Sequence, residues 1–357
     1  MGNIPLLDIS TFNDEQLSVW VVAHFEKAFR AKQISEWLWK KNVSSFDEMS
    51  NLPSGFIQTL KGHFYIPKIK IAEKQVSSDG SIKYAVQLHD KHWIEMVLIP
   101  AKKRSTVCVS SQVGCGLNCR FCATAHVGFS RNLTAYEMYE QVFRANQESM
   151  VHFGHPISNI VWMGMGEPLL NYENVMQAID YITTAKGMGM SKDRITLSSC
   201  GIVKGIRQLA DDKSKVHLAI SLHSAHLEQR SDIMPINKSN PLPALSNALV
   251  YYYQKTNQRI TIEYLLLNGE NDSLEHARLL AIFCKRFPVK INIIEYNPHP
   301  YAVFSATNKQ QQALFIDYLK NKNLVVNLRL SKGKDIAAAC GQLAKKKTSL
   351  IFHSFRI

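Results

Sequence analysis

From Thr134 onward the chain alternates short apolar runs with amphipathic helical stretches, a rhythm that few fold classes accommodate. The runs that read as strands are residues 157–163, 194–197, 216–222, 260–267, 289–296 and 324–328. The stretches between them place apolar residues at helical spacing, as at Val175, Ile179 and Ile182. Strands that alternate with helices predict a parallel sheet. With a further strand at 105–110, we expect six or seven parallel strands in an open or closed barrel.

Two different segments precede this repeat. Residues 13–65 combine apolar residues at helical spacing with many lysines and arginines, which predicts a basic helical module, although a solvated helix face over core tryptophans explains the same pattern. Residues 68–111 change to short alternating runs, which predict antiparallel strands. We therefore divide the chain into an N-terminal helical accessory domain, a β-strand bridge, a barrel core and a basic tail, at residues 1–66, 67–103, 104–344 and 345–357.

The length of the chain and its net charge indicate its domain content and the kind of partner it favours. The chain has 357 residues, enough for one large core and an accessory domain. Lys plus Arg number 42 against 29 Asp plus Glu, a formal net charge of +13. This surplus favours a polyanionic partner, although a basic protein with no such partner has the same composition. No stretch resembles a membrane span or a signal peptide, so we expect a cytoplasmic protein with no membrane partner.

The cysteines point to metal or redox chemistry. Four of the seven cysteines lie between Cys108 and Cys122, and without an export signal this argues against a disulfide scaffold. Cys115, Cys119 and Cys122 form a C-x3-C-x2-C run, whose thiolates can hold three corners of a [4Fe–4S] cluster and leave one iron open. A zinc site completed by His126 is the alternative, but structural zinc usually takes ligand pairs from two separate knuckles.

Other candidate residues follow predicted strands at their carboxyl ends, where parallel sheets place their sites. In Gly164-Met-Gly-Glu-Pro168 the small residues allow close backbone approach to a ligand, and Glu167 offers a carboxylate. Residues 197–201 and 221–223 occupy equivalent positions. Taken alone, each segment is also an ordinary turn signal.

Several motifs in a fixed order resemble those of the RlmN-type adenine C2-methyltransferases of the radical-SAM superfamily. They are Arg30-Ala-Lys-Gln-Ile-x-x-Trp37-Leu, Cys115-x3-Cys119-x2-Cys122-Ala-Thr, Gly128-Phe-Ser-Arg-Asn-Leu-Thr134, Gly164-Met-Gly-Glu-Pro-Leu169, Asp232-Ile-Met-Pro-Ile-Asn237 and Asp335-Ile-Ala-Ala-Ala-Cys-Gly-Gln-Leu343. The resemblance spans nearly the whole chain, and several ordered motifs are more specific than any one. Ala125-His-Val127 departs from the glycine-lysine version usual in the family. The related Cfr-type enzymes, which methylate carbon 8 of the same adenine, fit less well at 128–131 and 164–169.

The resemblance implies a fold, cofactors and a ligand set. The fold would be an α/β radical-SAM partial (βα)6 TIM-like barrel, with a small N-terminal helical domain and a short antiparallel β extension. One [4Fe–4S] cluster would be held by Cys115, Cys119 and Cys122, and two molecules of S-adenosylmethionine would be used per turnover. The residues matched to S-adenosylmethionine binding are Gly166, Glu167, Ser198, Ser221, Leu222, His223 and Asn297. Asn297 precedes a proline and is equally compatible with a turn.

The resemblance also implies a reaction. Carbon 2 of an adenine in large-subunit (23S) ribosomal RNA would be methylated, with transfer RNA as a second substrate. This carbon has no lone pair for polar methyl transfer, so the family uses a radical route in which Cys340 carries the methyl group and becomes linked to the base. Cys108 would then release the product by forming a Cys108–Cys340 disulfide. Glu95 matches a proton acceptor, although an exposed acid on an alternating strand explains it as well.

The implied partners are ribosomal and transfer RNA and an external electron donor such as flavodoxin, and we expect a monomer. The N-terminal module and Lys102, Lys103 and Arg104 are candidate RNA backbone contacts. Cys200 has no implied role, and Cys284 is expected in the core. Three alternatives remain: a Cfr-like carbon 8 methylase, a non-catalytic zinc-dependent RNA-binding protein, and a radical-SAM enzyme for a small molecule that makes no use of Cys340.

Overall fold

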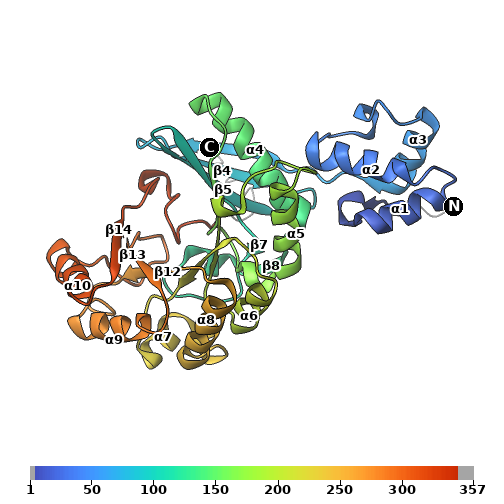
Figure 1. Ribbon diagram of the computed structural model, residues 1–357. Coiled ribbons are helices and arrows are strands. Elements are labelled where there is room, and N and C mark those ends of the chain that lie inside the picture. Colours follow the sequence, from blue (N-terminus) through green and yellow to red (C-terminus); the bar gives the residue numbers. More distant parts are fainter. Residues whose placement is uncertain (1–4, 345–357) are drawn as a thin grey trace, which may run out of the picture.

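A ten-stranded sheet runs through the computed structural model, which describes residues 5–344 (Figure 1). The strand order is β14-β13-β12-β11-β10-β9-β6-β5-β4-β3. From β6 to β14 every neighbouring pair is parallel. These strands are β6 (Arg104–Cys108), β9 (Asn159–Trp162), β10 (Ile195–Ser199), β11 (His217–Ser221), β12 (Ile260–Leu266), β13 (Val289–Glu295) and β14 (Val325–Arg329). The predicted parallel sheet is confirmed, and its order leaves the barrel open.

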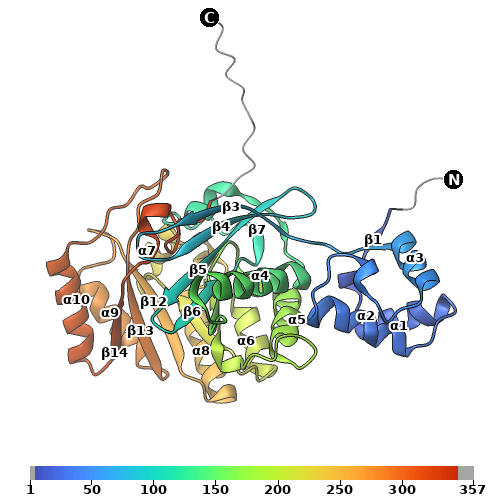
Figure 2. The same cartoon turned by 90° about the horizontal axis from the view of Figure 1, so that it is seen from above.

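Helices lie along the outer side of the curved sheet (Figures 1 and 2). They are α4 (Ala135–Phe153), α5 (Tyr172–Thr183), α6 (Val203–Asp211), α8 (Leu242–Thr256), α9 (Leu274–Cys284) and α10 (Lys309–Asn321). The short helix α7 (Leu227–Ile233) follows β11 and packs on the cysteine loop. The predicted apolar face of α5, Val175, Ile179 and Ile182, is buried, and Cys284 lies in the core as expected. In the part of the chain that is described, no helix has both the length and the apolar character needed to cross a membrane.

The antiparallel strands predicted before the repeat are present and continue the same sheet. β3 (Lys70–Val76), β4 (Ile82–Gln87) and β5 (Trp93–Ala101) pair in sequence, and β5 pairs antiparallel with β6. The extension therefore lies beside the strand that leads to the cysteine loop.

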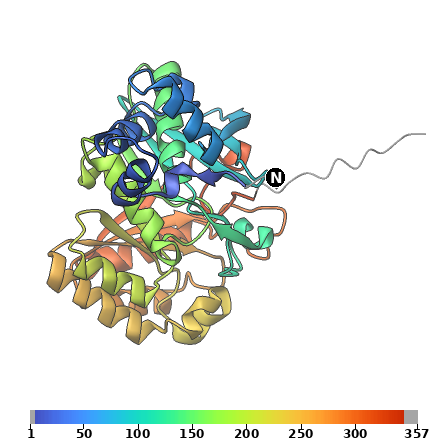
Figure 3. The ribbon, with the colours of Figure 1, turned by 90° about the vertical axis from the view of Figure 1, so that its right-hand side faces the viewer.

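The N-terminal module packs beside α4 and α5 (Figure 3). It contains α1 (Asp14–Ala23), α2 (Phe29–Ser35), a helical turn (Glu36–Lys40), α3 (Ser54–His63), and a small parallel sheet of β1 (Leu7–Asp8) and β2 (Phe64–Tyr65). The sequence did not predict this small sheet. Trp39 stacks on Tyr181 of α5 with ring centroids 3.5 Å apart, and its carbonyl accepts a hydrogen bond from Tyr139 of α4. The basic tail predicted at 345–357 lies outside the described residues.

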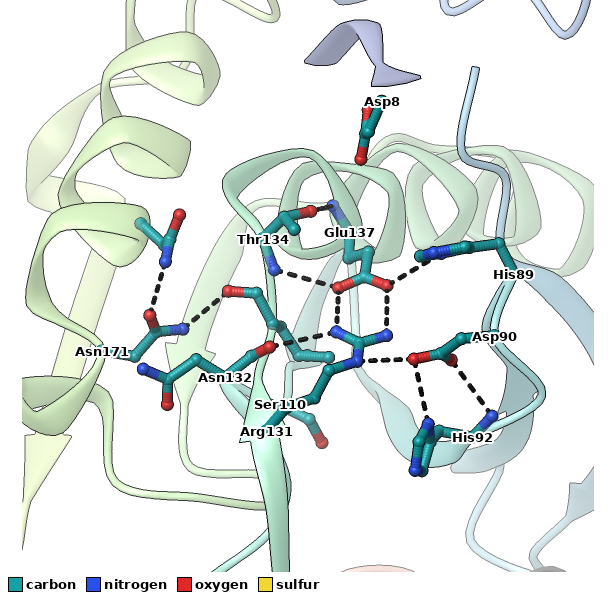
Figure 4. Close-up of polar contacts among 12 residues, drawn as sticks. Asp8, His89, Asp90, His92, Ser110, Arg131, Asn132, Thr134, Glu137 and Asn171 are labelled. Carbon is teal, nitrogen blue, oxygen red and sulfur yellow. Dashed lines mark hydrogen bonds and ion pairs between the residues drawn. The ribbon is translucent and has the colours of Figure 1, made fainter. Parts of the chain in front are cut away.

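The Gly128–Thr134 motif stabilises the start of α4 (Figure 4). Thr134 and Glu137 form the capping box that the sequence predicts. Arg131 donates two 2.8 Å hydrogen bonds to the buried Glu137 carboxylate and one of 2.6 Å to Asp90 in the β4–β5 turn. Burial acts to raise the pKa of Glu137, but hydrogen bonds from Arg131 and His89 outweigh it and leave this pKa lowered. The motif thus ties the end of the cysteine loop to α4 and the β extension.

Replacing Arg131 with methionine should destabilise the protein by about 3 kcal/mol, because Glu137 would remain buried without its main partner. The folded-state pKa of Glu137 is lowered, so its carboxylate contributes fully to the free energy of unfolding above the ordinary pKa of 4.5. This contribution is lost as pH falls through the folded-state pKa. Urea unfolding at pH 7 and pH 4 tests both points. Arg278→Met, which breaks an exposed pair with Glu275, should unfold close to the wild-type midpoint. Equal effects of the two substitutions would contradict the prediction.

Candidate active site

A cavity of about 290 Å³ opens at the carboxyl ends of β6, β9, β10 and β11 and collects most of the predicted site residues. Its wall includes Cys108, Cys115, Cys119, Cys122, Gly166, Glu167, Ser198, Ser221, His223 and Cys340. Three predicted site residues, Leu222, Asn297 and Glu95, do not form part of this wall. Leu222 is fully buried, and the Asn297 amide donates to the wall residue Ser331 at 2.8 Å.

The cysteine loop has a closed base. It connects β7 (Gln112–Gly114) to β8 (Phe129–Asn132), which pair antiparallel. Gly114 has φ 74°, and a Cβ there would lie 1.5 Å from the Gly128 carbonyl oxygen, so only glycine allows the two ends to meet. The N–H of Cys115 donates to that same carbonyl at 3.1 Å. This crossing directs the three cysteines toward the cavity.

The thiol environment fits an iron-sulfur cluster. Burial raises the pKa of Cys115 to about 12 and also raises that of Cys122, so both thiols stay protonated unless a positive partner binds them. Metal ligation deprotonates such thiols. Within residues 5–344 no three His, Cys, Asp or Glu side chains converge to hold a single ion. A four-iron cluster does not need that convergence, because each thiolate binds a different iron.

His126, the fourth ligand of the zinc alternative, points elsewhere. Its ring stacks on Tyr301 with centroids 4.4 Å apart, and it does not border the cavity that the three cysteines line. The geometry therefore provides no Cys3His set.

Glu167 and Gly166 form the turn after β9. Both Glu167 oxygens accept backbone N–H groups, from Cys200 at 2.7 Å and from Leu169 at 3.0 Å. Burial raises the pKa of Glu167 against the effect of these hydrogen bonds. Gly166 has φ 98°, and a Cβ there would meet the Gln112 side chain at 2.5 Å. The turn is therefore pressed against β7, next to the cysteine loop.

His223, after β11, is held as a neutral ring. Its Nδ1 accepts the Leu265 N–H at 3.0 Å. Burial, with the charge of Arg230, lowers the pKa of His223 to about 3. Its edge packs on Phe121 of the cysteine loop, with ring centroids 4.7 Å apart. His223 therefore offers a fixed, uncharged surface to a ligand.

Cys108 and Cys340, far apart in the sequence, share this cavity with a cation. Burial raises the pKa of Cys108 to about 12, and the nearby Cys340 adds to the effect. Arg329, at the end of β14, lies on the same wall 3.7 Å from Glu263. Cys340 is the main reason that the pKa of Arg329 is raised. Arg329 is not among the predicted site residues, although it directly follows the predicted strand 324–328, at the carboxyl end where parallel sheets place their sites.

The β extension holds the segment that carries Cys340. Asp79 in the β3–β4 turn accepts the Gly333 N–H at 2.9 Å, and Asp335 accepts the Ser78 N–H at 3.0 Å. Glu95 is 4% exposed, so its interpretation as an exposed acid is wrong. One of its oxygens accepts the Ala344 N–H at 2.7 Å. Backbone hydrogen bonds therefore fix the Cys340 segment on both sides.

Replacing Asp79 with alanine should loosen this segment. Burial acts to raise the pKa of Asp79, but the Gly333 and Ser81 hydrogen bonds lower it to about 2, which shows how strongly they favour the carboxylate. We expect faster amide exchange at residues 333–344, with a cost of about 1 kcal/mol in the free energy of segment opening. Hydrogen exchange with mass spectrometry tests this. Asp317→Ala, an exposed change on α10, is the control, and unchanged exchange in the Asp79 variant would contradict the prediction.

Comparison with known proteins decides the family. Residues 7–66 match the family described as "Ribosomal RNA large subunit methyltransferase N-terminal domain", and residues 109–280 match "Radical SAM superfamily". A protein of Christiangramia forsetii named "Probable dual-specificity RNA methyltransferase RlmN" is 50% identical over 339 residues, covering 95% of this chain and 96% of the relative. The chain belongs to the RlmN family. An RlmN relative from Cytophaga hutchinsonii is 47% identical and covers 95% of this chain and 93% of its own length.

A solved structure agrees with this RlmN assignment. A radical SAM methyltransferase from Sphaerobacter thermophilus superimposes with a TM-score of 0.87 at 35% identity, covering 94% of this chain and 99% of that one. The predicted family and radical-SAM fold are therefore confirmed. As a radical-SAM member of the RlmN family, the chain is an RNA methyltransferase that uses an iron-sulfur cluster and S-adenosylmethionine.

Proposed function

We propose that this RlmN family member methylates carbon 2 of an adenine in RNA by way of a methyl group carried on Cys340. The main support is the presence of Cys108 and Cys340 on the wall of the cavity that also holds Cys115, Cys119 and Cys122. Substrates are large-subunit (23S) ribosomal RNA and transfer RNA, in keeping with the description of the N-terminal domain family and the "dual-specificity" in the relatives' names.

Each part of the wall has a role in this proposal. Cys115, Cys119 and Cys122 would hold one [4Fe–4S] cluster. With S-adenosylmethionine bound, this cluster would supply one electron, taken from an external donor such as flavodoxin, for reductive cleavage of the sulfonium. Glu167 offers buried carboxylate oxygens to the ligand, Gly166 allows close approach, and His223 presents a neutral ring. Ser198 and Ser221 complete the wall, while Leu222 and Asn297 support it from behind.

The two remaining cysteines divide the work of methyl carriage and release. Two molecules of S-adenosylmethionine would serve one turnover, the first as methyl donor to the Cys340 sulfur and the second as source of the radical that removes one hydrogen atom from this S-methyl group. Arg329 stabilises the negative charge that the Cys340 sulfur carries when it attacks the methyl donor. Once the base is linked to Cys340 through the transferred carbon and one electron has returned to the cluster, Cys108 would attack the Cys340 sulfur. The disulfide would form as the bond from this sulfur to the carbon breaks, and the carbon would take the Cys108 proton to become the methyl group of the base. Glu95 accepts the ring proton once Ala344 leaves its carboxylate.

RNA would be bound outside the cavity by the N-terminal module, which we propose as an accessory domain of residues 1–66, next to the bridge 67–103 and the core 104–344. Lys102, Lys103 and Arg104 are exposed at the β5–β6 turn and suit phosphate contacts. The target adenine must leave its stack to reach Cys340. We propose that a monomer suffices, since every proposed catalytic group lies in one chain.

The deciding experiment is anaerobic incubation of reconstituted protein with methyl-labelled S-adenosylmethionine and RNA, followed by nucleoside mass spectrometry. We expect 2-methyladenosine from ribosomal and transfer RNA. Finding 8-methyladenosine would assign the chain to the Cfr-like activity instead. Bound zinc without iron or sulfide would contradict the radical route and favour a zinc-dependent RNA-binding protein. Methylation of a small molecule that does not require Cys340 would favour a radical-SAM enzyme with a different substrate.

A further inference from the structure

Arg230 is a fully buried cation with no anionic partner among residues 5–344. It lies on α7, and its guanidinium donates to the carbonyls of Leu222 and Cys200 at 3.1 and 2.8 Å and to the Asn237 side chain at 2.8 Å. None of these groups carries a charge. Burial lowers the pKa of Arg230 only to about 10, so it stays protonated at neutral pH. An unpaired buried charge is costly, and such charges are normally paired or bind an ion.

Arg230 lies directly behind the cysteine loop. The end of α7 packs on this loop, since Ile233 joins Cys119 and Phe121 in one apolar cluster and its carbonyl accepts the Arg120 N–H at 3.0 Å. The Cys200 carbonyl links Arg230 to the wall of the cavity, which the Cys200 and Cys119 side chains both line. Cys200 thus connects the Arg230 guanidinium to the wall that also holds the proposed cluster ligand Cys119.

Nearby titratable groups do not neutralise this charge. Glu167 binds the N–H of the Cys200 peptide while Arg230 binds its carbonyl, so the two side chains approach opposite ends of Cys200 and form no ion pair. His223 is neutral because burial and Arg230 lower its pKa. A cluster bound by three thiolates has a net negative charge and would supply the missing partner.

We propose that Arg230 is a positioning residue that serves as the fixed counter-charge of the thiolate-bound cluster. It thereby raises the reduction potential of the cluster and makes cluster loading stabilise the fold. The inference rests on the proposed ligand set of Cys115, Cys119 and Cys122. It concerns how a residue that holds no ligand affects the potential of the cluster, and it adds no step to the methylation reaction.

The test is the midpoint potential of the reconstituted cluster in Arg230→Gln, without RNA. Glutamine keeps a hydrogen-bond donor for the Cys200 carbonyl but removes the charge. At the wild-type midpoint we expect the ratio of reduced to oxidised cluster to fall about tenfold, equivalent to about 59 mV for one electron. We also expect cluster loading to raise the melting temperature less than in wild type. Arg286→Gln, which removes a cation bonded to Ser246 and Asn247, should change neither value.

Arg230→Lys separates charge from hydrogen bonding and serves if the glutamine variant does not fold. A wild-type potential in the lysine variant supports the counter-charge. A loaded glutamine variant with the wild-type potential, or a lysine variant whose potential falls away from wild type, would overturn it. If the wild-type protein itself binds no iron and sulfide, the proposed function fails. If the loaded Arg230→Gln variant keeps the wild-type midpoint potential, only the inference about Arg230 fails.

Discussion

Cys340→Ala should lower methyl transfer to RNA to below about one-thousandth of the wild-type rate, because the variant lacks the sulfur proposed to carry the methyl group. The iron-sulfur absorption should remain, since Cys340 belongs to the segment after β14 and is no part of the three-cysteine loop. The fold should also remain, because Cys340 is exposed and alanine leaves no buried hole. Transfer of labelled methyl groups to RNA, measured beside the absorption spectrum, checks both expectations.

Cys284→Ala is the matched control for this experiment. This cysteine is buried at the end of α9, away from the cavity wall, so its loss should affect stability and leave methyl transfer near wild type. Mass spectrometry of the wild-type protein after incubation with S-adenosylmethionine should show one added methyl group on the peptide that contains Cys340. Full activity of Cys340→Ala would refute the carrier role, even with the cluster intact.

Cys108→Ala should stop the reaction at a later point and trap RNA on the protein. Cys108 lies at the end of β6 on the same cavity wall as Cys340, whose sulfur is proposed to hold the base. Without it no disulfide forms, and the bond from Cys340 to the base should persist. A denaturing gel should show a protein band that moves with bound RNA and returns to its position after nuclease treatment.

The double variant Cys108→Ala, Cys340→Ala distinguishes a covalent link from tight binding. It should give no shifted band, because the attachment atom is gone. Arg329→Met should slow formation of the adduct without changing its identity, since Arg329 acts on the charge of the sulfur. Clean release of methylated RNA from Cys108→Ala would show that another group performs the release.

The sequence predicts elements with regular patterns well. The strand runs and the helix-spaced apolar residues of α5 correspond to observed elements because period and burial are local properties. The capping box of Thr134 and Glu137 was predictable for the same reason. The carboxyl-end rule brings Gly166, Ser198 and the cysteine loop to one cavity without any three-dimensional information.

What the sequence did not predict depends on contacts between distant segments. Glu95 reads as exposed on an alternating strand, yet the Ala344 segment covers it. Asn297 follows a predicted strand, but its amide faces Ser331 and not the cavity. Arg230 belongs to a short helix whose surroundings no local pattern specifies. In each case the contacting residue is far away in the sequence, and hydrophobic periodicity reports only on residues that are close in sequence.

The attachment of the Cys340 segment to the β extension has a consequence for repeated catalysis. Asp79, Asp335 and Glu95 hold this stretch mostly through backbone N–H groups, and the side chains of Lys334, Asp335 and Cys340 are exposed. Water can replace these polar contacts at little cost, but Ala338, Ala339 and Leu343 of the same stretch are buried, and withdrawing their side chains would be expensive. We therefore expect low-cost motion between the stages of the proposed reaction to be confined to the exposed residues Lys334, Asp335 and Cys340, while the buried side chains keep the stretch docked on the sheet.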